Sequence, residues 1–138
     1  MGGSPTVYVL DSFAVLAYLG GEAGMERVQA LLQECAQGKC QALFSLINLG
    51  EVIYIVEREH SLTKAQEVLA TLDQLPVQVL PVTRAIVLAA AHIKANYPIA
   101  YADALVVAAA LEHQGAILTG DPEFEAVSGV VQVEWLPK

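Results

Sequence analysis

Short apolar runs rich in β-branched residues alternate along this chain with longer segments in which apolar residues recur at helical spacing. The run at 6–10 (TVYVL) has no regular polar alternation, which is typical of a strand covered on both faces. In contrast, Val28, Leu31, Leu32 and Cys35 follow the spacing of one helix face. The pattern predicts strands at 6–10, 41–44, 77–82, 116–120 and 130–136, and helices at 13–19, 22–37, 46–60, 62–75, 84–96 and 103–111, with a short turn or helix through 124.

Strands that alternate with helices indicate a doubly wound α/β domain with a mainly parallel sheet of about five strands and helices on both faces. Pro81 places the third strand at an edge or at a strand end, because proline cannot donate to a sheet ladder. The partial alternation in 130–136 indicates an edge strand as well. We expect residues 1–5 to be a flexible N-terminus and residues 6–138 to form a single domain.

Four acids interrupt the apolar pattern at positions where the fold should bury them. Asp11 and Asp121 each follow an apparent core strand, whereas Glu51 and Asp103 lie in strongly apolar helices. In open α/β sheets ligands bind beyond the carboxyl ends of the strands, so these side chains are expected to meet in one crevice. An ionised carboxylate in such surroundings needs a partner or a metal.

Each acid also has an explanation that requires no site. Asp11 or Ser12 can cap the helix that follows, and Asp103 is favourably placed near a helix N-terminus. Glu51 can lie on a solvated stripe together with Asn48, three residues earlier. The sequence leaves these alternatives open for each acid taken alone.

The charge balance narrows the chemistry. Fifteen acids against seven Lys and Arg give a net charge of −8, which argues against binding nucleic acid through a broad basic surface. Two carboxylates about 4 Å apart repel by roughly 4 kcal/mol at an effective dielectric near 20, so four of them require cations. Oxygen ligands suit Mg²⁺ or Mn²⁺, and phosphodiester hydrolysis is the natural chemistry of such a site.

Three motifs together resemble the PIN domain, most closely the VapC-type toxin ribonucleases: VYVLDS, then NLGEV, then YADALVVAAALEHQGAILTGDPEF. The resemblance covers nearly the whole chain and implies a metal-dependent endoribonuclease acting on RNA. It implies that Asp11, Glu51, Asp103 and Asp121 form the acidic catalytic set. Metal ligation falls to the three aspartates among them, supported by Ser12 and Thr119, with Glu123 as an extra acid at the rim.

The same resemblance implies a toxin held by an antitoxin protein. A stand-alone RNA-processing nuclease and a catalytically idle interaction domain remain as alternatives. The apolar segment 46–56 and the amphipathic helix 62–75 are expected to leave a groove for an antitoxin helix or for a second copy of the chain, and a homodimer is expected. An aspartyl-phosphate phosphatase is disfavoured because Phe13 stands where a second Asp is usually needed.

Cys35 and Cys40 lack neighbouring histidines and the paired CxxC spacing of a zinc site, so we expect reduced structural thiols. The longest apolar run, 104–111, is far shorter than the roughly 20 residues of a membrane span, and no secretory leader is recognisable. The sequence therefore predicts a cytoplasmic protein without membrane contact. His60, His92 and His113 are assigned no role.

Overall fold

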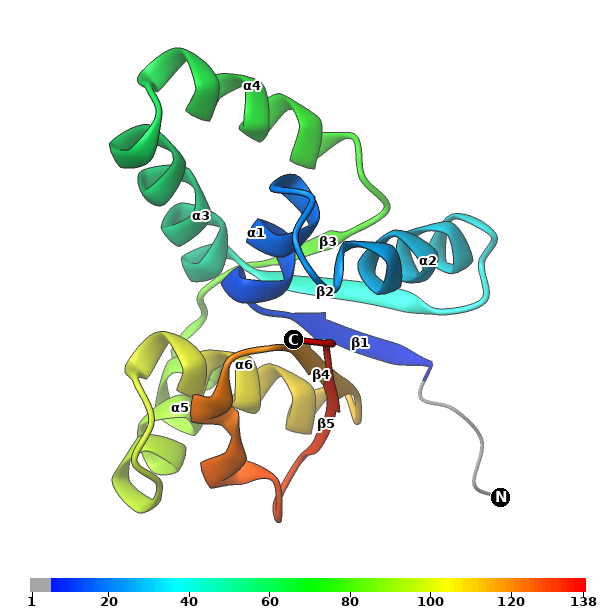
Figure 1. The fold of residues 1–138 in the computed structure, drawn as a ribbon. Coiled ribbons are helices and arrows are strands. Elements are labelled where there is room, and N and C mark those ends of the chain that lie inside the picture. The colour runs from blue at the N-terminus through cyan, green and yellow to red at the C-terminus, as the bar shows by residue number, and fades with distance from the viewer. Residues whose placement is uncertain (1–5) are drawn as a thin grey trace.

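A five-stranded, all-parallel sheet with the strand order β3-β2-β1-β4-β5 forms the centre of the computed structural model, which describes residues 6–138 (Figure 1). The strands are β1 (Val7–Leu10), β2 (Gln41–Ser45), β3 (Gln78–Leu80), β4 (Ala116–Thr119) and β5 (Gln132–Trp135). The helices are α1 (Ser12–Leu19), α2 (Met25–Ala36), α3 (Leu46–Glu59), α4 (Leu62–Asp73), α5 (Arg84–Asn96), α6 (Tyr101–Glu112) and the 3-10 helix η1 (Pro122–Val127). The doubly wound prediction is confirmed, and the expectation for residues 1–5 lies outside the described part of the chain.

Several element ends differ from the sequence prediction for local reasons. The second helix begins at Met25 rather than near 22, because Gly24 precedes it with a positive φ of 96° that no helix continues. β3 contains three residues instead of six, and it ends directly before Pro81 at one edge of the sheet. Ser45, Ser61 and Thr83 each accept a hydrogen bond from the first turn of the helix that follows.

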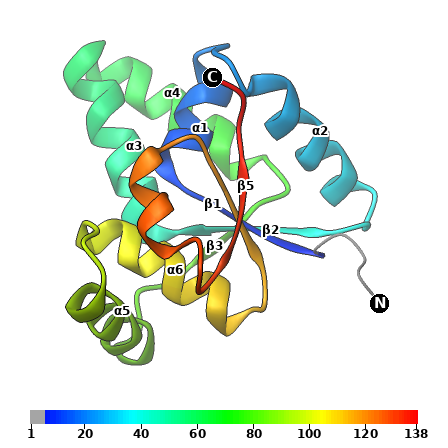
Figure 2. The same cartoon turned by 60° about the horizontal axis from the view of Figure 1, so that its bottom comes forward.

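Helices cover the two faces of the sheet unequally (Figure 2). Helices α1 to α4 pack with one face in a hydrophobic core that includes Leu10 and Phe44. Helices α5 and α6 and the 3-10 helix η1 pack with the other face, around Val9 and Ile117. Seven consecutive residues of α6, Ala104–Ala110, are buried, so this helix is enclosed on almost every side. Its first turn, which carries Asp103, is thereby fixed relative to the sheet.

The connections reverse direction at the middle of the sheet. From β1 the chain builds outward through β2 and β3 on one side, and β4 and β5 are then added on the other side. Leu10 of β1 lies in register with Leu118 of β4, so the residues after both strands emerge next to each other. Such a switch point leaves a crevice at the carboxyl ends of the strands, and this is where Asp11 and Thr119 lie.

Among the described helices, none combines the length and apolar character needed to cross a membrane.

Candidate active site

Asp11 is the most buried acid of the site, with 2% of its surface exposed. Its Oδ1 accepts a hydrogen bond from the Ala14 N–H at 2.9 Å and so caps α1, while its Oδ2 accepts one from the Thr119 hydroxyl at 2.6 Å. Burial raises the pKa of Asp11 to about 7, and Asp121 adds to the rise, while the two hydrogen bonds oppose it. The capping role and the site role therefore belong to the same side chain.

The turn after β4 orients Asp121. The Thr119 hydroxyl accepts the Asp121 N–H at 3.0 Å, and Oδ1 of Asp121 accepts the N–H of Glu123 at 2.9 Å, which caps the 3-10 helix η1. Thr119 therefore holds Asp11 through its proton and Asp121 through its oxygen. One fully buried hydroxyl fixes the spacing of two of the predicted ligands.

Gly120 lies in close contact with an aromatic ring in this turn. A Cβ at this position would lie 2.8 Å from Cζ of Phe13, closer than real Cβ atoms approach a neighbour. The Phe13 ring therefore lies against the backbone between Thr119 and Asp121, and a larger residue at position 120 would require the ring to move.

Asp103 projects from the first turn of α6 toward Asp121 and Glu123, in the turn after β4. Carboxylate oxygens of Asp103, Asp121 and Glu123 all lie within 4.8 Å of one another. The pKa of Asp103 is raised to about 8. Burial is the largest cause, Glu123 contributes next through repulsion and a hydrogen bond, and repulsion from Asp121 and Asp11 adds to the rise. Asp103 thus interacts electrostatically with Glu123, Asp121 and Asp11, while Asp11 itself lies outside the group of three carboxylates.

Glu123 has a larger structural part than the sequence indicated. Its carboxylate accepts the backbone N–H of Ala100, the residue before α6, where no side chain of that helix supplies a cap. Its own N–H binds Asp121. Glu123 therefore ties the helix that carries Asp103 to the turn that carries Asp121. The sequence analysis placed Glu123 only at the rim of the site. It could not predict this link, because the contact with Ala100 joins segments 23 residues apart.

Glu51 lies with the α1 side of the site and is absent from the three-carboxylate group. Its carboxylate accepts hydrogen bonds from the Ser12 hydroxyl and from Nδ2 of Asn48, the latter at 3.3 Å. Nδ2 of Asn48 also reaches Oγ of Ser12 at 3.0 Å. Asn48 is fully buried, so this pair does not form a solvated stripe. Asn48 is the residue that sequence reasoning did not assign to the site, and its only signal was a polar position in an apolar helix.

No basic side chain neutralises the acids of the site within the described residues, where the salt bridges involve only Arg27 and Lys64. The donor set consists of carboxylate oxygens, with no histidine or cysteine in the group. Hard oxygen donors in excess negative charge fit Mg²⁺ or Mn²⁺ rather than a thiolate- or imidazole-seeking metal. The residues present therefore fit a divalent cation of this kind.

Comparisons with known proteins agree with this geometry. A family model described as the PIN domain matches residues 8–130. The fold is similar to that of VapBC2 from Rickettsia felis bound to a DNA fragment from its promoter, with a TM-score of 0.74 and 15% identity over 95% of this chain and 99% of that one. It is also similar to Mycobacterium tuberculosis VapC20, a sarcin-ricin loop cleaving toxin, with a TM-score of 0.73 and 20% identity over 94% of this chain and 99% of that one. FitAcB from Neisseria gonorrhoeae gives a TM-score of 0.67 and 23% identity over 91% and 95% of the two chains. No curated protein matches the sequence.

Proposed function

The chain belongs to the PIN-domain family, and from this premise we propose that it is a metal-dependent endoribonuclease and the toxin of a toxin–antitoxin pair. The observation that carries the proposal is the group of carboxylates at the switch point of the sheet, which lacks a cationic partner among the described residues. A carboxylate cluster of this kind repels itself, and folds retain such repulsion at functional sites. The similarity to VapC-type and FitAB folds supports the toxin assignment.

Asp11, Asp103 and Asp121 are the proposed metal ligands, and Glu123 is close enough to two of them to add a fourth oxygen. A bound Mg²⁺ or Mn²⁺ supplies a lowered pKa for an attacking water and neutralises the charge that develops on a phosphodiester. Thr119 holds the first ligand in place through a buried hydrogen bond, and the N–H of Glu123 orients the third. These hydrogen bonds support the assignment of Asp11 and Asp121 as ligands.

Glu51 is the remaining member of the proposed catalytic set. Its carboxylate accepts hydrogen bonds from the hydroxyl of Ser12, the residue directly after Asp11, and from the side-chain amide of Asn48. Ser12 and Asn48 thus keep the Glu51 carboxylate directed toward the start of α1 instead of toward solvent. We propose that Glu51 acts from this side of the crevice, opposite the group formed by Asp103 and Glu123.

The substrate in this proposal is RNA whose backbone phosphate docks at the metal. With seven Lys and Arg in 138 residues, the chain offers little basic surface to hold a long nucleic acid. The carboxylates of the crevice would hold a divalent cation, whose positive charge would supply the local attraction for phosphate. Recognition then depends on the shape of a structured RNA around one scissile bond. We propose the cytoplasm as the place of this activity, in agreement with the two free cysteines.

Cleavage of a panel of structured RNAs, with Mg²⁺, Mn²⁺ or EDTA, tests the function. Endonucleolytic products are expected with either metal and none in EDTA. Asp103→Asn should abolish them, and Asp73→Asn, the same change on an exposed carboxylate at the end of α4, should leave cleavage unchanged. Full cleavage in EDTA contradicts the metal-dependent mechanism. Absence of cleavage in every condition favours the idle interaction domain.

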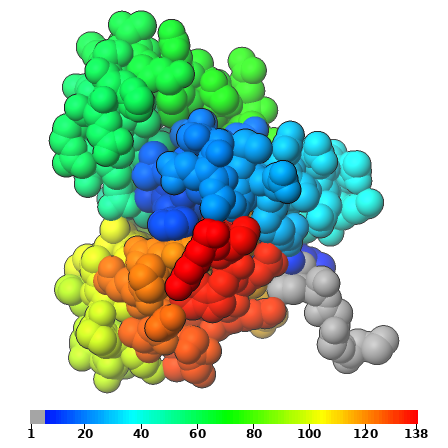
Figure 3. All heavy atoms as spheres, in the orientation of Figure 1, coloured from blue at the N-terminus to red at the C-terminus, as the bar shows by residue number. Residues whose placement is uncertain are grey.

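An antitoxin helix is the proposed occupant of a hollow between α1 and the α3–α4 hairpin. The hollow has a volume of about 540 Å³, and Leu16, Ile55 and Val68 line its apolar part. In Figure 3 the surface of α3 and α4, in green, stands above that of α1 and α2, in blue. Leu62 at the start of α4 is 57% exposed, so the hairpin presents apolar surface for burial by a partner.

Binding of the product of an adjacent small gene, measured by calorimetry, tests this partner. Thr71→Arg introduces a long charged side chain into the hollow without altering the core, and we expect at least about tenfold weaker binding. Gln66→Arg, an exposed position of the same helix that does not line the hollow, is the matched control. Equal affinity of both variants contradicts the site, and a chain with no such neighbouring gene favours the stand-alone nuclease.

We also propose that the chain forms a homodimer. Large apolar side chains outside the hollow are exposed on α5 and in the segment before it, at Leu88 and Val82. Light scattering of the purified protein is expected to give the mass of two chains, and Leu88→Lys should shift it toward one. A monomer at all concentrations contradicts this proposal.

A further inference from the structure

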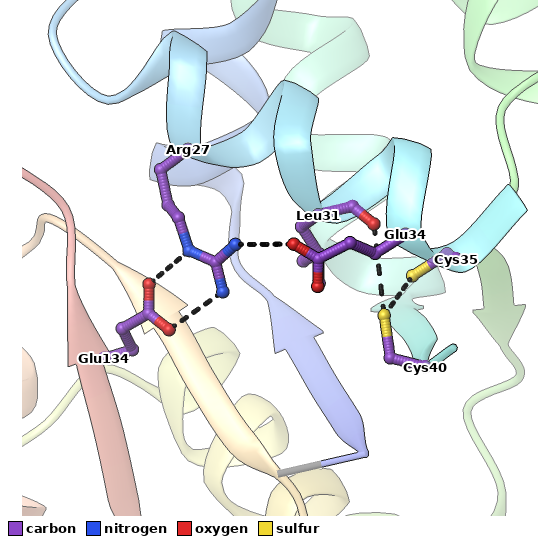
Figure 4. Close-up of polar contacts among 6 residues, drawn as sticks. All are labelled: Arg27, Leu31, Glu34, Cys35, Cys40 and Glu134. Atoms are coloured by element: carbon purple, nitrogen blue, oxygen red, sulfur yellow. Dashed lines mark hydrogen bonds and ion pairs between the residues drawn. The ribbon is translucent and has the colours of Figure 1, made fainter. Parts of the chain in front are cut away.

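Cys35 and Cys40 bring their sulfur atoms together on the far side of the domain from the candidate active site. The two Sγ atoms lie 3.1 Å apart, and the Cys40 Sγ lies 4.0 Å from the carbonyl oxygen of Leu31 (Figure 4). Both residues are free cysteines and half-buried. The sequence predicted two structural thiols, and the spacing of five residues gave no sign that they touch.

A rigid turn creates this contact. The N–H of Lys39 binds the carbonyl of Glu34 at 3.0 Å, and the N–H of Gly38 binds that of Cys35 at 3.0 Å. This pair of bonds is a Schellman motif, and it requires the left-handed backbone that Gly38 adopts with a φ of 78°. The chain therefore folds back over the last turn of α2, and Cys40 returns to the level of Cys35. Pairing of Gln41 with β1 then fixes the chain on the other side.

Small reagents can reach the sulfur atoms. The two cysteines line an open hollow of about 350 Å³ together with Leu75, Pro76 and Val77. A thiol pair at hydrogen-bond distance, held by backbone hydrogen bonds beside an open hollow, has the arrangement from which a disulfide forms. The Sγ–Sγ distance must shorten by about 1 Å to reach the length of such a bond.

We propose that Cys35 and Cys40 form a reversible modification site, which a low-molecular-weight disulfide oxidises to an intramolecular Cys35–Cys40 disulfide. The proposal rests on the sulfur contact, the turn that holds it and the open hollow, and it is independent of the proposed nuclease function. In a reducing compartment the site is a dithiol, and it is oxidised when the thiol–disulfide balance shifts.

The chemistry proceeds by thiol–disulfide exchange in two steps. The Cys40 thiolate attacks one sulfur of glutathione disulfide, and a Cys40–glutathione mixed disulfide and one glutathione are formed. The Cys35 sulfur then loses its proton and attacks the Cys40 sulfur, and the second glutathione leaves. Two thiols are oxidised and one disulfide is reduced to two thiols, so atoms and electrons balance.

The order of attack follows from the surroundings of Cys35. Burial, in the first place, and then Cys40 and Glu34 raise the pKa of Cys35 to about 12, so this thiol stays protonated at neutral pH. Cys40 is therefore the first nucleophile. Once Cys40 is in a mixed disulfide, its contribution to the pKa of Cys35 is removed.

The place of the site in the fold predicts what oxidation does. Cys40 precedes the N-terminal end of β2, whereas the candidate active site lies beyond the C-terminal ends of β1 and β4. The bond therefore links α2 to the start of β2 without contact with the carboxylates. It should raise resistance to unfolding, because a cross-link restricts the unfolded chain, and it should leave RNA cleavage unchanged.

Intact mass and thiol trapping after incubation of the full chain in glutathione redox buffers test the proposal. We expect the oxidised wild type to lose the mass of two hydrogen atoms, to expose no thiol to iodoacetamide and to remain one chain. Cys35→Ser should form only a glutathione adduct at Cys40, and Cys40→Ser should react more slowly, because burial keeps its remaining thiol, Cys35, protonated. A wild type that acquires only glutathione adducts or intermolecular disulfides overturns the proposal.

Thermal melts give a second measurement that does not depend on trapping. The oxidised wild type should melt about 5 °C above the same protein in dithiothreitol. The single serine variants should show no dependence on dithiothreitol, which separates the cross-link from general effects of the reductant. Equal midpoints for oxidised and reduced wild type, with the internal bond absent by mass, overturn the proposal.

Discussion

Arg27 joins Glu34 and Glu134 in one ion-pair cluster between α2 and β5, whereas the acids at the ends of β1 and β4 have no cation among the described residues. Nε of Arg27 donates to Glu134 at 2.6 Å and Nη2 at 3.1 Å, and Nη1 lies 3.5 Å from Glu34 (Figure 4). The guanidinium also lies 5.5 Å from the centre of the Tyr8 ring. Its pKa is raised above the ordinary arginine value, mainly by the hydrogen bonds to Glu134.

The difference between these two regions separates structure from function. In the Arg27 cluster each of the two carboxylates has the guanidinium as a cationic partner, so the cluster links α2 to β5 without a cation from solution. In the crevice, burial and mutual repulsion raise the pKa values of Asp11 and Asp103 to about 7 and about 8. We expect that region to be unfavourable for folding without a cation, in agreement with the proposed metal site.

The largest expected effect is on catalysis. Replacing Asp11, Asp103 or Asp121 by Asn should lower the rate of RNA cleavage by at least about 100-fold, because each change removes one carboxylate ligand of the proposed metal. Single-turnover assays with Mg²⁺ measure it. Glu125→Gln, an exposed acid in the 3-10 helix η1 outside the carboxylate group, is the control and should cleave at the wild-type rate. If all three Asn variants retain full activity, the two regions do not differ in function.

The metal-free protein should lose stability as pH rises from about 4 to about 8. Asp11 and Asp103 have folded-state pKa values above the ordinary value of 3.8, so in this window the native state binds more protons than the unfolded state. The contribution of these two carboxyls to stability is therefore fully present below their unfolded-state pKa. It is lost as the pH rises through their folded-state pKa values. The slope is at most about 1.4 kcal/mol per pH unit for each carboxyl.

Melts in EDTA at pH values from about 4 to about 8 give the measurement. Mg²⁺ should flatten the profile, because a cation favours the ionised carboxylates. A melting midpoint that rises with pH in EDTA contradicts the repulsion between the carboxylates of the crevice. The crevice would then resemble the Arg27 cluster.

Removing one charge sharpens the same comparison. Asp103→Asn should melt above the wild type in EDTA, because the mutual repulsion exists in the folded chain and is largely relieved on unfolding. Saturating Mg²⁺ or Mn²⁺ should stabilise the wild type by about 2–3 kcal/mol, and the variant by less. If Asp103 only favours a helix N-terminus, Asn costs up to about 1 kcal/mol and metal makes no difference.

The fold was predictable from sequence because its strands are short apolar runs that no helix pattern imitates. The runs at 6–10 and 116–120 became β1 and β4, and the helix prediction at 84–96 matched α5 residue for residue. Element ends were less predictable because single backbone geometries decide them. The positive φ of Gly24 shortened α2, and Pro81 shortened β3.

The site was predictable only as far as topology determines it. Asp11 and Asp121 follow strands that lie side by side, so their convergence followed from the switch point. The links of Glu123 to Ala100 and of Asn48 to Ser12 depend on side-chain directions across segments distant in sequence. The contact between Cys35 and its partner likewise depends on one left-handed glycine, which composition and spacing do not reveal.

The smallest expected effect concerns the Arg27 cluster. Arg27→Met keeps most of the aliphatic length but leaves Glu134 without its partner, and we expect a loss of about 1–2 kcal/mol in the free energy of unfolding. The loss is modest because both side chains keep part of their surface in water, 27% for Arg27 and 35% for Glu134.

Lys64→Met, which removes an exposed ion pair with Glu67 at 3.9 Å, should change stability by less than about 0.5 kcal/mol. Urea denaturation in EDTA compares the two variants, and metal should not restore Arg27→Met relative to the wild type, because no carboxylate of the crevice contacts this arginine. A stability gain in Arg27→Met would show that the cluster, like the crevice, is a cost to the fold, and the distinction between the two regions would fail.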